Sequence, residues 1–264
     1  MITMLLEIFY RIMKNQINIG FIGGCAITQH NITRQNRFYS IFQKKIADKK
    51  LYRPVFSFTR YTDYNYLKEA CDEVMNKSSL DLLIIHIRPQ PFYILSKLLI
   101  KYRRKINRNS ICINPLLLSK IIYRKFEINP PNNLNQSYTK PRFMDINILL
   151  GNIFSLRSKA SSLIYNEISS IRSLCIDNNI KLVVLGIPYQ PLSWIGNINC
   201  HRLNLFLKEK FKNDNVEYLD CYDKMKDKEC FHKDKLHFSN KGHYVLGSIL
   251  YEGLKHFTTA NHST

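Results

Sequence analysis

Five short apolar segments, spread along the chain, constrain the fold of this sequence more than any other feature. They are rich in β-branched and aromatic residues, and they lie at 17–23, 53–58, 81–87, 180–187 and 215–220. Most are nearly continuous apolar runs. Such runs are typical of strands buried on both faces of a parallel sheet, whereas a half-exposed antiparallel strand alternates apolar and polar residues. We therefore expect five mostly parallel strands.

Segments with helical periodicity lie in the gaps between these strands. They cover 64–77, 156–178, 201–212 and 239–256, with Ser239 as a candidate N-cap of the last one. The Asp and Asn residues at 177–179 are a candidate helix stop. The alternation predicts an α/β fold: a doubly wound, five-stranded sheet with helices on both faces, a three-layer sandwich. Ligands of such sheets bind beyond the carboxyl ends of the strands.

One long segment interrupts this alternation. Residues 105–150 hold no clear strand, and 128–141 are rich in Pro and Asn. The length of 264 residues suits a single α/β domain. We therefore expect one domain over 1–264, with an insertion or lid at 105–150.

The chain is strongly basic, with 39 Lys and Arg against 20 Asp and Glu, a formal charge of +19. Residues 82–126 contain ten basic residues and no acidic one. This stretch predicts a face for an anionic ligand or a membrane surface, although a compositional bias toward Lys, Asn and Ile also raises the charge. No nucleic-acid-binding motif accompanies it, so we do not expect a nucleic acid as partner.

The seven cysteines are odd in number and widely spaced, which argues against a disulfide scaffold and for a reducing compartment. The first residues are apolar but carry Glu7 and Arg11, and they lack the features of a secretory signal. No uncharged apolar run is long enough to cross a membrane. We expect a cytoplasmic protein.

Two short motifs could carry chemistry. Asp234 and His237 are three residues apart, just before the last helical segment. The imidazole could act as a general base while the carboxylate orients it, and a solvated loop pair is the structural alternative. Gly23, Gly24 and Cys25 directly follow the first strand. Glycines permit a sharp turn with backbone N–H groups available to an oxyanion, and Cys25 would be a nucleophile there or a small buried residue.

Together these motifs resemble the SGNH/GDSL hydrolase superfamily. Its first block reads roughly I-G-D-S-I-T, and here Ile22-Gly23-Gly24-Cys25 stands at that place. Its last block supplies an Asp and a His, matched by Asp234 and His237 in DKLHFSNKGHYVLGSIL. The preceding NVEYLDCYDKM resembles the final strand and the loop after it. The resemblance covers the two ends and the order of the strands.

The sequence also departs from that family at defined positions. Cys25 replaces the serine, and Gly24 replaces the aspartate before it. The third block, G-x-N-D, corresponds to Arg88-Pro89-Gln90-Pro91, so Gln90 stands where the oxyanion-holding Asn is expected and Arg88 could bind an anionic group. The glycine of the second block has no clear match within 55–65.

The resemblance implies acyl-ester chemistry with Cys25 as nucleophile, His237 as base and then acid, Asp234 as its orienting partner, and Gly24 and Gln90 at the oxyanion. We expect O-acyl transfer, chiefly acetyl transfer, to a carbohydrate in surface-polysaccharide synthesis. An esterase or thioesterase is the first alternative, and an inactive binding protein with a basic face is the second. No tightly bound cofactor is implied, and acyl-CoA is a candidate donor.

A metal site at the C-terminal histidines is a further alternative. Cys230, His232, His237 and His243 lie within a short stretch, but their spacing matches no familiar zinc pattern. We therefore expect no metal.

Overall fold

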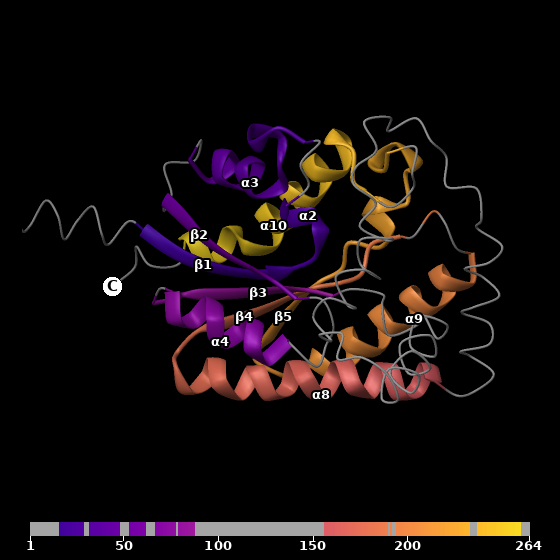
Figure 1. Ribbon diagram of the computed structural model, residues 1–264, viewed down its shortest axis with the longest axis horizontal. Helices are drawn as coiled ribbons and strands as arrows, with labels where there is room; N and C mark the ends of the chain where they lie inside the picture. Colours follow the sequence, from indigo (N-terminus) through magenta and orange to yellow (C-terminus); the bar gives the residue numbers. More distant parts are fainter. Residues whose placement is uncertain are drawn as a thin grey trace, which may run out of the picture.

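The computed structural model describes residues 16–28, 32–47, 53–61, 67–77, 79–87, 156–189, 191, 194–232 and 237–259. Its strands are β1 Gln16–Gly23, β2 Arg53–Arg60, β3 Leu82–His86, β4 Lys181–Leu185 and β5 Val216–Leu219. They form one sheet in the order β2-β1-β3-β4-β5, and every neighbouring pair is parallel (Figure 1). The five predicted strands and their parallel arrangement are confirmed.

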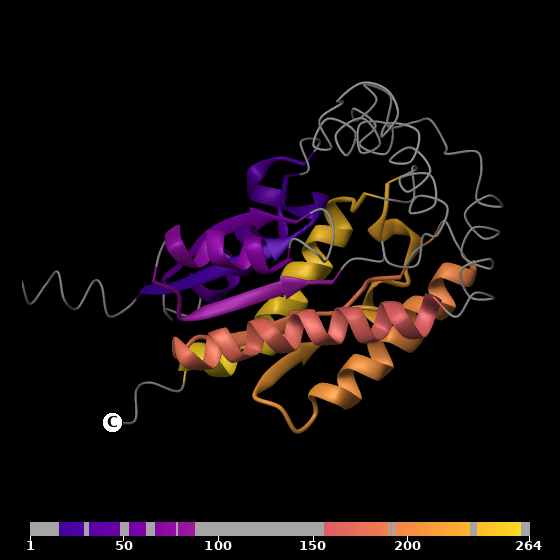
Figure 2. The same ribbon diagram turned by 60° about the horizontal axis from the view of Figure 1, so that its bottom comes forward.

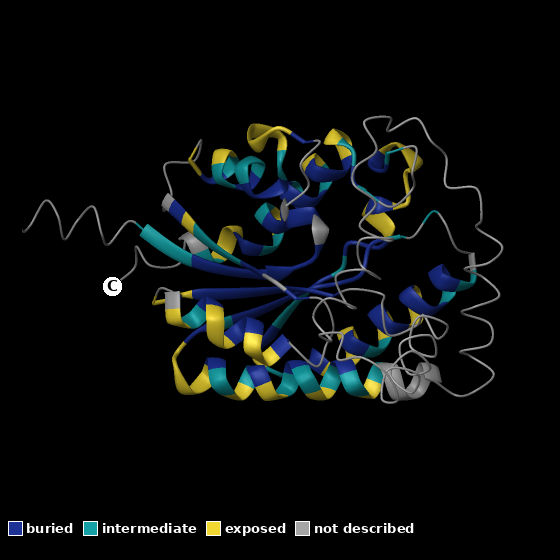
Figure 3. Ribbon diagram, in the orientation of Figure 1, coloured by how far each residue is buried: buried dark blue, intermediate teal, exposed yellow. Residues whose placement is uncertain are grey.

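Helices cover both faces of this sheet, as predicted (Figures 1 and 2). One face carries α4 Leu67–Lys77, α8 Leu156–Asp177 and α9 Trp194–Phe211. The other carries α2 Cys25–Thr28, α3 Phe38–Ala47 and α10 Asn240–Thr259. The strands are buried between the two layers, whereas the helices expose their outer sides (Figure 3). We call these two sides of the sheet the α8 face and the α10 face. Each of them has its own apolar core.

Local sequence explains how two of the helices begin and end. Asn179 adopts a left-handed conformation with φ of 54°, and the N–H of Ile180 donates to the Cys175 carbonyl at 2.7 Å. This ends α8 where the Asp and Asn residues predicted a stop. The Ser239 hydroxyl accepts the N–H of Gly242 at 3.2 Å, which confirms the predicted N-cap of α10.

Two helices differ from the sequence-based expectation. The helix α3 was not predicted, although Phe38, Phe42 and Ile46 form a buried stripe at helical spacing. The helix α9 begins at Trp194 rather than at the predicted residue 201. Its first two turns are rich in asparagine, and the apolar pattern becomes regular only after them. Asn197 and Asn199 are nevertheless buried.

The predicted insertion at 105–150 lies outside the described residues. Within the part of the chain that is described, no helix is long and apolar enough to cross a membrane.

Candidate active site

The glycine-rich turn lies at the carboxyl end of β1, one of the inner strands of the sheet. The strand ends at Gly23, Gly24 forms a buried bend, and Cys25 is the first residue of α2. The N–H of Ile27 donates to the Gly24 carbonyl at 3.2 Å and closes the first helical turn. A Cβ at position 23 would lie 2.8 Å from the Phe21 ring and 3.2 Å from Ile27, so only glycine lets α2 pack this closely on the strand.

The loop that carries His237 is held by backbone pairing. Phe231 and Phe238 form an antiparallel bridge, and the His232 N–H donates to the His237 carbonyl at 2.9 Å. The Ser239 N–H donates to the Cys230 carbonyl, also at 2.9 Å. His237 is therefore a half-buried residue whose backbone is fixed just before α10. Asp234 lies outside the described residues.

A row of packed rings connects this loop to β1. Phe238 meets the His243 ring edge to face at 5.8 Å, His243 stacks on Phe38 at 6.1 Å, and Phe38 contacts Phe21 at 4.9 Å between ring centroids. The Phe38 N–H also donates to His243 Nδ1 at 3.3 Å. The contacts place the predicted nucleophile turn and the His237 loop on the α10 face, at the carboxyl ends of the strands.

His243 has a structural role in this arrangement. It is fully buried, and burial, together with the positive charges of Arg37 and His232, lowers its pKa to about 4. The ring is therefore neutral near pH 7, as its acceptor role toward Phe38 requires. Across the described residues, no group of three or more His, Cys, Asp or Glu is arranged to hold a metal ion.

His86 and Tyr61 belong to this edge but were not among the predicted site residues. His86 is the last residue of β3 and is only 6% exposed. The Tyr61 hydroxyl donates to the His86 carbonyl at 2.9 Å, and the Tyr61 N–H donates to the Gly23 carbonyl at 3.3 Å. A histidine at the end of an otherwise apolar strand was the sequence feature that could have identified this position.

Other described thiols are poor candidates for a nucleophile. Burial raises the pKa of Cys71, Cys175 and Cys200 to about 12. It also raises the pKa of Cys221 and Cys230, and the Cys221 thiol donates to the Gly186 carbonyl at 2.8 Å. Because thiolate is the reactive form, these five residues are expected to be inert. Cys25 differs from them in standing at the start of a helix at the carboxyl edge.

The predicted anion-binding and oxyanion residues Arg88 and Gln90 lie outside the described residues, as does the basic stretch after residue 87.

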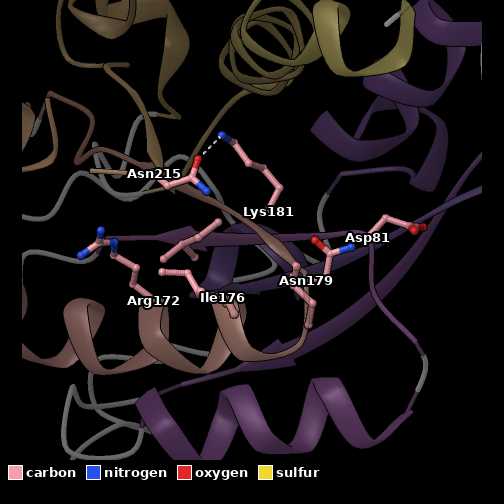
Figure 4. A pocket seen from close by; sticks show the side chains of 9 residues that line it. Asp81, Arg172, Ile176, Asn179, Lys181 and Asn215 are labelled. Atoms are coloured by element: carbon pink, nitrogen blue, oxygen red, sulfur yellow. Dashed lines mark hydrogen bonds between the residues drawn. The ribbon is translucent and has the colours of Figure 1, made fainter. Parts of the chain in front are cut away.

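A pocket of about 230 Å³ lies at the opposite, amino edge of the sheet (Figure 4). Asp81 precedes β3, Lys181 begins β4 and Asn215 precedes β5, and all three line it. The Lys181 ammonium donates to the Asn215 side-chain oxygen at 2.9 Å. The pocket is separated from Cys25 by the length of the strands, so it is not part of the candidate site.

No protein-family model matches this sequence, and no curated protein matches it. Solved structures do resemble it. A lipase from a goat rumen metagenome has a TM-score of 0.56 at 13% identity, over 90% of this chain and 97% of the lipase. An acetyl xylan esterase has a TM-score of 0.53 at 10% identity, over 90% of this chain and all of the esterase chain.

A GDSL-like lipase from Bacteroides thetaiotaomicron has a TM-score of 0.50 at 10% identity, over 90% of this chain and 87% of the lipase. At these identities the likeness concerns the fold. It extends over nine-tenths of the chain, and the parallel strands and the helices on both faces agree with the sequence-based expectation. The chain therefore has the fold of the SGNH/GDSL hydrolases.

Proposed function

We propose that this protein catalyses acyl-ester chemistry through Cys25, and that its reaction is the transfer of an acyl group, chiefly acetyl, to a carbohydrate hydroxyl. One observation carries the proposal: the Gly24–Cys25 turn follows β1 at the carboxyl edge, on the face that also carries the His237 loop. The fold it shares with lipases and esterases supports the same chemistry.

In the first step, the Cys25 sulfur attacks the carbonyl carbon of an ester or thioester. His237 accepts the thiol proton and delivers it to the departing oxygen or sulfur, while a C–S bond forms and the donor bond breaks. The Gly24 turn, with the backbone N–H of Cys25, and the Gln90 amide are the candidate donors to the oxyanion. Asp234 would orient His237 and stabilise its protonated form.

In the second step, His237 removes the proton of an acceptor hydroxyl. The oxygen then attacks the thioester, the C–S bond breaks and the Cys25 thiol is restored with that proton. Water as the acceptor makes the protein an esterase or thioesterase, and a sugar hydroxyl makes it a transferase.

Three considerations support a carbohydrate acceptor and a charged donor. A thioester intermediate exchanges acyl groups readily with another thioester, which suits acyl-CoA as donor substrate. The +19 charge, Arg88 and the 82–126 stretch would suit the phosphates of that donor. A protein of the same fold is described as an acetyl xylan esterase. The proposed reaction needs no tightly bound cofactor. The basic stretch at 82–126 also suits an anionic membrane surface as partner.

The direct test compares the release of free CoA from acetyl-CoA in the presence and in the absence of a carbohydrate acceptor. Free CoA is quantified by chromatography for wild type, Cys25→Ala and a matched thiol variant, Cys175→Ala, on the opposite face of the sheet. We expect release that depends on Cys25, survives Cys175→Ala, and rises when oligosaccharides with free hydroxyls are added. Release that is unchanged by sugars identifies a thioesterase. Equal release by wild type and Cys25→Ala would contradict the proposal and favour the binding-protein alternative.

A further inference from the structure

His86 stands at a position in the sheet that brings a buried imidazole to the predicted nucleophile. The strand β3 lies directly beside β1, and Ile85 pairs with Ile22 in the register. His86 therefore lies next to Gly23, where β1 ends and the turn to Cys25 begins. Its 6% exposure places it in the protein interior rather than in the solvated loops.

The face toward which His86 projects follows from the alternation of β3. Leu82 and Ile84 belong to the core of the α10 face, whereas Leu83 and Ile85 belong to the core of the α8 face. Because side chains alternate along a strand, His86 projects with Leu82 and Ile84. It therefore shares its face with α2, α3 and α10.

The packing around Gly23 places His86 against α2. A Cβ at position 23 would lie 3.4 Å from the His86 Cβ and 3.2 Å from the Ile27 Cδ1. His86 and α2 thus meet over the same glycine, and Cys25 is the first residue of that helix. A side chain at position 23 would come between the His86 imidazole and the turn.

We propose that His86 is a further catalytic residue that acts on the nucleophile: its imidazole takes the Cys25 thiol proton and holds the resulting thiolate as an ion pair. This proposal rests on the proposed function and changes one of its proton transfers. In the resting protein the S–H bond is broken and an N–H bond is formed on His86. Protonated His237 then donates its proton to the leaving group as the C–S bond forms, and it regains a proton from the acceptor hydroxyl in the second step. His86 keeps its proton throughout and pairs with the thiolate again when the C–S bond breaks.

Other described groups on this face are less suited to the task. They are Tyr39, Arg37, Cys221, Cys230, His232, His237 and His243. Arg37 donates to the Ile32 carbonyl and to the Tyr39 hydroxyl. His243 is neutral and accepts the Phe38 N–H. His232 and His237 belong to the loop before α10, whereas His86 lies directly beside the glycine that precedes the turn.

The test measures how fast iodoacetamide alkylates Cys25 as a function of pH, with peptide mapping to locate the label. We expect the midpoint of the wild-type curve of alkylation rate against pH to lie below the ordinary thiol pKa of about 8.5. In His86→Gln, the midpoint should rise by about one pH unit, so that alkylation at pH 6.5 slows about tenfold. The control His256→Gln changes an exposed histidine on α10 and should leave the profile unchanged.

Circular dichroism verifies that each variant is folded. If His86→Gln does not fold, His86→Leu replaces it, because leucine suits the end of a buried strand, and the same shift is expected. A folded His86 variant with the wild-type profile would overturn the proposal. So would a profile that shifts in His237→Gln and not in the His86 variant.

The assay separates this proposal from the proposed function because alkylation requires no acyl donor. A profile that depends on His86, in a protein that never forms an acyl adduct, would support the thiolate pair and contradict the acyl chemistry. An acetyl adduct on Cys25, together with an alkylation profile that does not depend on His86, would support the acyl chemistry and contradict the thiolate pair.

Discussion

The two edges of the sheet are built from similar residue types and differ in what those residues do. At the amino edge, charged and amide groups complete the secondary structure: Asp81 accepts the Asn18 N–H at 2.7 Å, and Arg172 pairs with Asp214 at 3.3 Å. At the carboxyl edge, polar groups lie deeper, and the buried His86 and His243 pack against the turn and the loop that carry Cys25 and His237.

This difference shows that the presence of a surface pocket does not by itself identify an active site. The pocket of about 230 Å³ is at the amino edge, where the left-handed Asn179 ends α8 and Lys181 bonds to Asn215. Helix ends and strand starts account for these groups. At the carboxyl edge, His243 accepts the first N–H of α3, but no helix end accounts for the buried His86 or for its close packing against Gly23. Parallel α/β sheets bind their ligands at this edge.

The largest contrast between the edges is expected for turnover. His237→Ala should lower the rate of acetyl transfer by a factor of about 1,000, because a general acid–base group is lost. Lys181→Ala, at the amino-edge pocket, should leave the rate unchanged. Steady-state rates of CoA release measure both. Loss of turnover in Lys181→Ala together with normal turnover in His237→Ala would reverse the assignment of the two edges.

Substitutions of two glycines of α10, Gly242 and Gly253, compare the end of the helix near the His237 loop with the end far from it. A Cβ at Gly242 would lie 2.0 Å from the Cys230 backbone carbonyl, so Gly242→Ala must displace the loop that holds His237. We expect it to cost about 3 kcal/mol of unfolding free energy and most of the turnover.

Gly253→Ala is the matched control for that substitution. Its Cβ would meet the end of the Leu219 side chain, which can move aside. We expect a loss of about 1 kcal/mol with normal turnover. Urea unfolding and the acetyl-transfer assay measure both effects. Equal costs for the two variants would show that the Cys230 contact is not restrictive.

The buried His243 predicts a dependence of stability on pH that belongs to the carboxyl edge. Its pKa falls from 6.5 to about 4 on folding. The unfolded chain therefore binds more protons between these values, and stability should decrease as the pH falls from about 6.5 to about 4. The decrease should be about 3 kcal/mol.

Urea unfolding at a series of pH values measures this decrease. His243→Gln keeps an acceptor for the Phe38 N–H and removes the titrating ring, so its stability should change less over that range. An identical pH dependence in both proteins would mean that other groups cause the decrease.

The smallest effect is expected at the amino edge. Arg172 and Asp214 form a partly exposed ion pair, with side chains 31% and 21% exposed. Arg172→Ala should therefore change the unfolding free energy by less than about 1 kcal/mol, and should not affect turnover. Thermal unfolding compared at low and high salt measures the contribution of the pair. A loss of several kcal/mol would show that this edge is more tightly coupled to the core than we infer.

The sequence predicted best those features that depend on local pattern. Buried parallel strands are nearly continuous apolar runs, which identified β1, β3 and β4, whereas β2 and β5 were recognised as short segments with β-branched and aromatic residues. Ser239 and the residues at 177–179 supplied helix boundaries through side-chain and backbone chemistry that acts within a few residues. The motif around Cys25 was placed correctly after β1 for the same reason.

Features that depend on distant partners escaped prediction. Asn204 looks like a solvated residue of α9, but its side chain bonds both the N–H and the carbonyl of Ile187, after β4. His86 reads as part of an apolar strand, and its meaning depends on the order that places β3 beside β1. The periodicity of a segment contains no information about such neighbours.

Intact-mass spectrometry after incubation with acetyl-CoA tests the central claim most directly. The same protein is then digested to locate any label, with an activated acetyl ester as a second donor and Cys25→Ala as the comparison. We expect one acetyl group on Cys25 in the wild type and none in the variant. An acetyl group that persists in Cys25→Ala, or a wild-type protein that turns over donor without an adduct on Cys25, would contradict the assignment of the nucleophile.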